Sequence, residues 1–249
     1  MQLRVATWNL NARTFVRPLP GWVGRELVGL QADLVVLTEH VPGGEVPALS
    51  QVLAEGGAAS VSLSDNRGAR ENRILIATRE PHTPGPIAQP ELDLVSAHAN
   101  FLSVTLASGV IGVGFRMPEY TKTPGGFAQL WDWLFATLAP YRGRDLILAG
   151  DLNADFVRSR DRRLRLAERF LEVGLQLVPV ADGVSFRGKT GPGTRIDHVF
   201  VGGSLRGVSG TYSWEAIDRE HPGCRGCSHG VPDHALLSAV VQRGSDRSE

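Results

Sequence analysis

The stretch LILAGDLN occupies residues 146–153. Its first four residues form an aliphatic run of the kind found in buried strands. Two polar side chains follow, Asp151 and Asn153, and residues two apart in an extended chain point to the same side. Gly150 allows the backbone to approach its surroundings closely. The stretch therefore predicts a buried strand that ends in two polar side chains on one face.

Comparable segments recur from one end of the chain to the other. The polar residues lie in Thr7-Trp8-Asn9, Thr38-Glu39, Gly150-Asp151-Leu152-Asn153, Arg195-Ile196-Asp197-His198 and Pro232-Asp233-His234. A rigid sheet can hold carboxylates and imidazoles from distant parts of a chain in one fixed geometry, which loops alone cannot do. The pattern predicts a single polar site built at the ends of several strands.

Strand-like and helix-like segments alternate irregularly. Strands are expected at 3–8, 34–37, 74–78, 92–96, 101–106, 110–115, 146–149, 196–201, 208–212 and 235–240, and helices at 22–30, 127–138 and 162–173. Some strands are separated by helices, whereas the middle ones follow one another directly. This order favours two sheets covered by helices. The proline-rich segment 81–90 is expected to be a loop.

The composition fits one domain. The chain has 249 residues, of which 42% are hydrophobic, and we expect residues 1–242 to form a single domain and 243–249 a flexible polar tail. No apolar run approaches the roughly 18 residues needed to span a bilayer, and no leader precedes the first strand. These features favour a cytoplasmic monomer. Lys+Arg and Asp+Glu number 26 each, which argues against the overall basic field of a processive DNA enzyme.

The order of the polar segments resembles the endonuclease/exonuclease/phosphatase family, which includes deoxyribonucleases, abasic-site endonucleases and sphingomyelinases. The resemblance covers nearly the whole chain. It implies an α/β fold, a four-layer α/β/β/α sandwich with two mixed sheets packed face to face. It also implies a hydrolase of phosphate esters that depends on Mg²⁺ or Mn²⁺ and acts as a phosphodiesterase or nuclease. Two alternatives stay open: a phosphomonoesterase for a small or lipid phosphate, and a catalytically silent relative that binds a phosphorylated ligand.

The resemblance assigns roles to individual residues. Glu39 matches the family's metal-binding glutamate, and carboxylates suit a hard cation. Asn9 matches an asparagine that touches the metal or the phosphate, and Asp233 would be a second carboxylate on the metal side. Asn11 is interpreted as a turn residue.

The resemblance assigns proton transfer to a second set of residues. His234 is the expected general base, because the ordinary pKa of histidine lies near neutrality, and Asp197 matches the aspartate that orients it. Asp151 would orient the nucleophile or take part in proton transfer, and Asn153 would bind the phosphate. His198 is interpreted as a packing residue.

The sequence departs from the family at Arg116, where relatives carry a histidine or tyrosine that contacts the phosphate. A guanidinium binds phosphate oxygens in a bidentate manner and keeps its charge. Arg116 is therefore either a phosphate ligand or a partner of Glu119 in a surface ion pair.

A second departure holds both cysteines of the chain. His221, Cys224, Cys227 and His229 have a spacing that could form a structural Zn²⁺ site, and a zinc-dependent interaction module is a further alternative function. Reduced loop cysteines or a labile local disulfide are the other interpretations.

Overall fold

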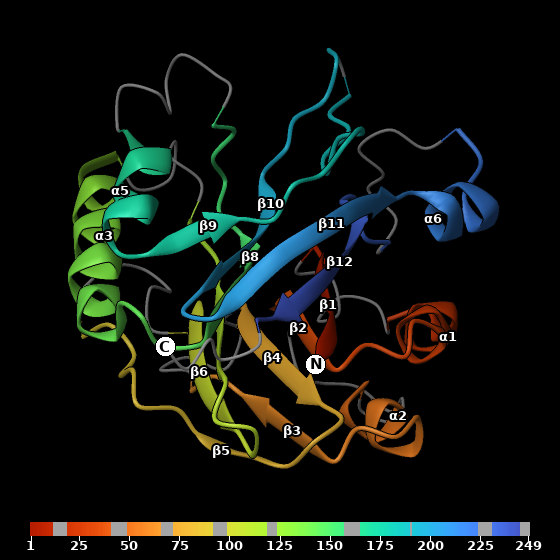
Figure 1. Ribbon diagram of the computed structural model, residues 1–249. Helices are drawn as coiled ribbons and strands as arrows, with labels where there is room; N and C mark the ends of the chain where they lie inside the picture. Colours follow the sequence, from red (N-terminus) through yellow and green to blue (C-terminus); the bar gives the residue numbers. More distant parts are fainter. Residues whose placement is uncertain are drawn as a thin grey trace.

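The computed structural model describes residues 1–11, 19–40, 49–65, 72–91, 99–118, 124–156, 165–189, 191–223 and 231–244. In these ranges the chain forms two mixed sheets of six strands each (Figure 1). The sheets pack face to face, and helices cover their outer faces. The expected four-layer sandwich is confirmed.

The first sheet has the strand order β11-β12-β1-β2-β4-β3. Its strands are β1 (Gln2–Asn9), β2 (Leu34–His40), β3 (Ser60–Leu63), β4 (Arg73–Thr78), β11 (Leu205–Ser213) and β12 (Leu236–Arg243). Its neighbouring helices are α1 (Gly21–Gly29), α2 (Leu49–Glu55) and α6 (Glu215–Glu220). Strands β1 and β2 are parallel and are connected through α1, whereas the other neighbours pair antiparallel.

The second sheet has the order β5-β6-β7-β8-β10-β9. Its strands are β5 (His82–Pro84), β6 (Phe101–Leu106), β7 (Ile111–Phe115), β8 (Leu146–Asp151), β9 (Leu175–Leu177) and β10 (Asp197–Gly202). Helix α3 (Pro124–Leu138), the 3₁₀ turn η2 (Ala139–Tyr141) and α5 (Leu166–Glu172) lie on its outer side. Strands β7 and β8 are its parallel pair and are connected through α3, so each sheet contains one helix crossover.

The interior between the sheets is tightly packed. Val104, Ile147 and Val199 of the second sheet are buried in the same hydrophobic cluster as the first sheet. A Cβ atom on Gly114 would lie 2.4 Å from a methyl carbon of Ile74, closer than two carbon atoms can approach. The absence of a side chain at Gly114 therefore permits the close contact that fixes the two sheets against each other.

Most expected elements exist, with shifted ends. The structure adds α2, α6, β3, β5 and β9, which the sequence patterns did not predict. The prediction that segment 81–90 forms only a loop is wrong, since β5 occupies part of it. Pro84 is tolerated in β5 because β5 is an edge strand, where a missing N–H group does not interrupt the sheet. The expected strand at 92–96 lies outside the described residues, as do residues 245–249 of the expected tail. Among the described helices, none is long and apolar enough to cross a membrane.

Candidate functional site

Three side-chain contacts join the two sheets at one end of the sandwich. They are Asn9 with Asp151, His234 with Asp197, and Glu39 with Arg116. In each pair the first residue belongs to, or directly precedes, a strand of the first sheet, and the second belongs to or follows a strand of the second sheet. The carboxyl ends of both parallel pairs meet here, which is where open α/β sheets commonly build their sites. The structure thus gathers residues that lie far apart in the sequence.

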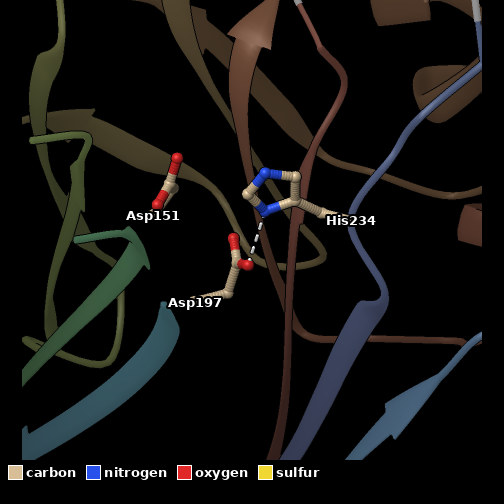
Figure 2. Close-up of side chains that lie close together, drawn as sticks. All are labelled: Asp151, Asp197 and His234. Carbon is tan, nitrogen blue, oxygen red and sulfur yellow. Dashed lines mark hydrogen bonds and ion pairs between the residues drawn. The ribbon is translucent and has the colours of Figure 1, made fainter. Parts of the chain in front are cut away.

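His234 and Asp197 form a buried hydrogen-bonded pair. Nδ1 of the imidazole lies 2.7 Å from Oδ2 of Asp197, and Figure 2 shows the carboxylate of Asp151 beside this pair. The indole nitrogen of Trp8 donates to the main-chain oxygen of His234 at 2.8 Å, and the ring of Phe186 lies 5.1 Å from the imidazole ring, centre to centre. These contacts hold the imidazole in one orientation and leave Nε2 free of the Asp197 carboxylate.

Asp151 ends β8 and accepts several hydrogen bonds. Its Oδ2 accepts from the side-chain amide of Asn9 at 2.8 Å and from that of Asn153 at 3.2 Å. Its Oδ1 accepts from the main-chain N–H of Asn153 at 2.9 Å. Asp151 and Asn153 therefore share one side, as expected, but a turn brings them together and not an extended strand, because Asn153 has a φ of 47°.

Strand β8 reaches this position because Gly150 carries no side chain. Gly150 has a φ of 145°, and a Cβ atom there would lie 1.9 Å from the carbonyl oxygen of Phe115. Any other residue would push β8 away from β7. The glycine therefore fixes where the carboxylate of Asp151 enters the site.

The acid groups strongly influence one another. Burial raises the pKa of Asp151 to about 7; the carboxylate of Asp197 adds to this rise and His234 opposes it. Burial alone would lower the pKa of His234, but the charge and hydrogen bond of Asp197, together with Asp151 and Asp233, raise it to about 10. These interactions favour the protonated imidazole, and burial makes Asp151 harder to ionise than an ordinary aspartate.

Arg116 lies beside both Asp151 and Glu39. It is only 8% exposed, its Nη2 forms an ion pair with Oε1 of Glu39, and its Nε lies 3.9 Å from Oδ2 of Asp151. Glu39 has a φ of 52° near the end of β2, a conformation uncommon for residues with a side chain. The expectation of a surface ion pair is corrected, because Arg116 is buried against Glu39; Glu119 lies outside the described residues.

The donor atoms fit a divalent cation. Ligand atoms of Asp151, Asp197 and His234 all lie within 4.8 Å of one another. Oδ1 of Asp197 is buried and has no hydrogen-bond partner within the described ranges, which is unfavourable unless a cation or donor meets it. Glu39 and Asn9 add further side-chain oxygen atoms to the site, because Asn9 contacts Asp151 and Glu39 contacts Arg116. Carboxylate and imidazole donors of this kind suit a divalent metal ion.

Comparison with known proteins identifies the family of the chain. The profile of the Endonuclease/Exonuclease/phosphatase family matches residues 6–246. The chain belongs to the endonuclease/exonuclease/phosphatase family. No curated protein matches the sequence closely enough to be named as a relative.

Solved structures of this family share the fold. An AP endonuclease from Archaeoglobus fulgidus is 19% identical with a TM-score of 0.67, over 95% of this chain and 98% of that one. A 3'-5' exonuclease from Neisseria meningitidis is 18% identical with a TM-score of 0.64, over 98% of this chain and 100% of that one. An endonuclease/exonuclease/phosphatase family protein from Leptotrichia buccalis is 14% identical with a TM-score of 0.65, over 96% and 99%. At these identities the likeness establishes the fold.

Three further residues named from the sequence lie near these groups, namely Asp233, Asn11 and His198. Oδ1 of Asp233 lies 3.9 Å from Nε2 of His234. Asn11 donates its main-chain N–H to Oδ1 of Asn9 at 2.8 Å and has a φ of 61°, which confirms a turn. His198 is buried and stacks on Phe156 at 4.6 Å between ring centres, as expected of a packing residue.

The structure describes only residues 221–223 of the expected zinc loop. His221 caps the end of α6, and Cys224, Cys227 and His229 lie outside the described residues. A structural Zn²⁺ at this loop stays a prediction.

Sequence patterns missed three residues that support Asp197 and His234. The hydroxyl of Ser185 accepts hydrogen bonds from the main-chain N–H groups of Ile196 at 2.8 Å and Asp197 at 3.0 Å. Tyr212 donates its hydroxyl to the main-chain oxygen of Asp197 at 2.7 Å. Phe186 was the third. None of them has a local signal, because each acts through a contact across the fold.

Proposed function

We propose that this protein is a divalent-metal-dependent hydrolase of phosphate esters, acting as a phosphodiesterase or nuclease with Mg²⁺ or Mn²⁺. The observation that carries the proposal is the buried pair of Asp197 and His234 beside Asp151, at the end of the sandwich where both parallel strand pairs stop. Family membership supports the reaction class. A net charge of zero leaves the choice between nucleic acid and another phosphate ester to experiment.

Glu39 and Asn9 would hold the metal, with Asp233, whose Oδ1 lies 3.9 Å from Nε2 of His234, as a second carboxylate. The bound cation would neutralise charge on the phosphate oxygens and on the leaving oxygen. Asn153 and Arg116 would bind the non-bridging phosphate oxygens, for which an amide and a guanidinium are suitable donors.

His234 would serve as the base. Its Nδ1–H is directed to Asp197, so Nε2 faces the reacting water. The oxygen of that water bonds to phosphorus, its proton passes to Nε2, and the bond from phosphorus to the leaving oxygen breaks. This role needs a neutral ring, whereas the surrounding carboxylates raise the pKa of His234 to about 10. Positive charge brought to those carboxylates favours the neutral form. Asp151, with its pKa raised to about 7 by burial, is the second group able to exchange a proton.

A substrate screen tests the proposal. The purified protein is assayed with Mg²⁺ and with Mn²⁺ on plasmid DNA, abasic DNA, RNA, bis-nitrophenyl phosphate, nitrophenyl phosphate and phospholipid. We expect cleavage of at least one diester and loss of that activity in His234→Ala. Hydrolysis of monoesters alone would indicate a phosphomonoesterase. A folded protein that binds a phosphorylated ligand and hydrolyses none of these substrates would contradict the proposal.

A further inference from the structure

Arg116 places a permanent positive charge against the carboxylate proposed to hold the metal. The guanidinium is buried and forms an ion pair with Glu39, while its Nε faces Asp151 at 3.9 Å. The main-chain N–H of Arg116 donates to the carbonyl oxygen of Asn100 at 3.0 Å. The backbone is therefore anchored, and the guanidinium is held beside two acidic side chains.

The burial and backbone conformation of Glu39 indicate that its contact with Arg116 serves more than stability. Its side chain is 12% exposed, and its φ of 52° follows a register shift in the pairing of β2 with β4. Such a conformation is usually retained where the surrounding structure determines it. The ion pair also removes both charges from water, which offsets much of their attraction. Since the ion pair between Arg116 and Glu39 adds little to stability, we explain it by the cation that Glu39 is proposed to bind.

We propose that Arg116 competes with the divalent cation for Glu39, so that the metal-free protein neutralises its own metal ligand. The proposal deepens the proposed function and rests on it in one respect, namely that Glu39 binds the metal. Two cations cannot share a nearly buried carboxylate without strong repulsion, and the guanidinium cannot lose its charge at any working pH. Repulsion from the guanidinium therefore weakens metal binding at Glu39, and a bound cation favours the transfer of the guanidinium from Glu39 to a phosphate oxygen.

Manganese binding without substrate tests the competition. Mn²⁺ affinity is measured by electron paramagnetic resonance for the wild type, Arg116→Met and Glu39→Gln. Methionine fills similar space without charge, so we expect Arg116→Met to lower the Kd for Mn²⁺ by about tenfold or more, the usual scale of a charge-assisted contact. Glu39→Gln should raise the Kd. An unchanged or higher Kd in Arg116→Met would overturn the proposal.

Arg243 supplies a matched control. It forms an ion pair with Asp145 at 2.6 Å, at the end of β12 farthest from His234. Arg243→Met removes the same charge from a more exposed ion pair, and we expect its Kd for Mn²⁺ to stay within about twofold of the wild type. An equal gain in Mn²⁺ affinity in both variants would attribute the effect to net charge and overturn the specific role of Arg116.

A metal-free measurement tests the ion pair itself. Unfolding in urea with EDTA is followed for Arg116→Met, Glu39→Gln and the double variant. We expect the double variant to lose less unfolding free energy than the sum of the losses in the two single variants. Each single variant leaves one buried charge without its partner, and the double variant leaves none. Additive losses would show that the pair does not form in the metal-free protein and would overturn the proposal.

The two proposals can fail separately. A wild-type protein that binds Mn²⁺ more weakly than Arg116→Met, yet hydrolyses no phosphate ester, would contradict the proposed function and support the competition. A protein that hydrolyses a diester with metal, but whose Mn²⁺ affinity does not respond to Arg116→Met, would contradict the competition alone.

Discussion

The two sides of the candidate site are built in different ways. On one side, Asp197 and His234 are held by a hydrogen bond and by main-chain contacts from Trp8 and Tyr212. On the other, Arg116 and Glu39 are joined by charge, and the backbone of Glu39 adopts an uncommon conformation. The first side consists of residues expected from the family resemblance, whereas the second combines the expected Glu39 with Arg116, where the sequence departs from that resemblance. The difference suggests that proton transfer needs a rigid arrangement, whereas the cation-binding side must change partners.

The largest expected effect comes from the rigid side. His234→Ala removes the proposed base, and we expect the turnover rate to fall by about 10²–10⁴, the usual contribution of a positioned general base. Steady-state kinetics on bis-nitrophenyl phosphate at saturating metal measures the change. His82→Ala is the control, because His82 lies in β5 and hydrogen-bonds with Ser62 and Thr78; it should stay within about twofold. Similar rates for wild type and His234→Ala would remove His234 from the chemistry.

The second prediction concerns the charged side. At saturating metal, Arg116→Ala should lower kcat/KM by about ten- to a hundredfold, because it removes a charge-assisted contact to the phosphate. Arg116→Lys should recover only part of the loss, since a point charge cannot reproduce the planar guanidinium. Kinetics within about twofold of the wild type for Arg116→Ala would mean that the guanidinium does not touch the substrate.

The sequence predicted one side better than the other. Asn9 and Asp151 stand at the ends of apolar runs, and His234 stands just before one. Their meeting at one edge therefore follows from the topology of two sheets. The partner of Arg116 could not be predicted, because Glu39 lies in the other sheet and the contact depends on how closely the sheets pack. Ser185 gave no signal, since only its folded position brings its hydroxyl to β10.

The third prediction concerns the pH dependence of the stability that His234 contributes on the rigid side. Asp197, Asp151 and Asp233 raise the pKa of His234 to about 10, above its ordinary value of 6.5. The stabilisation is therefore complete below about pH 6.5 and is lost as the pH rises towards 10. In EDTA, the free energy of unfolding of the wild type should fall between pH 7 and 10 by at least about 1 kcal/mol more than that of His234→Gln, since one pKa unit corresponds to about 1.4 kcal/mol. Parallel pH profiles in urea unfolding would contradict a raised pKa.

The smallest effect is expected for Tyr212, which supports the backbone of Asp197. Tyr212→Phe removes the hydroxyl that donates to the main-chain oxygen of Asp197. We expect a loss of about 1 kcal/mol in unfolding free energy, the typical value for one buried hydrogen bond, and turnover within about threefold. Tyr141→Phe removes a hydroxyl that donates to Pro86 at an exposed position and should cost less. Equal stabilities for both variants would show that the Tyr212 contact does not support Asp197.

The central claim is that a divalent cation at this site is required for hydrolysis of a phosphodiester. The direct measurement is turnover of bis-nitrophenyl phosphate by protein exhaustively chelated with EDTA, followed by titration of Mg²⁺ or Mn²⁺ back into the same sample. We expect the chelated protein to be inactive and the returned metal to restore turnover in the wild type but not in His234→Ala. Full activity in the chelated protein would contradict the claim.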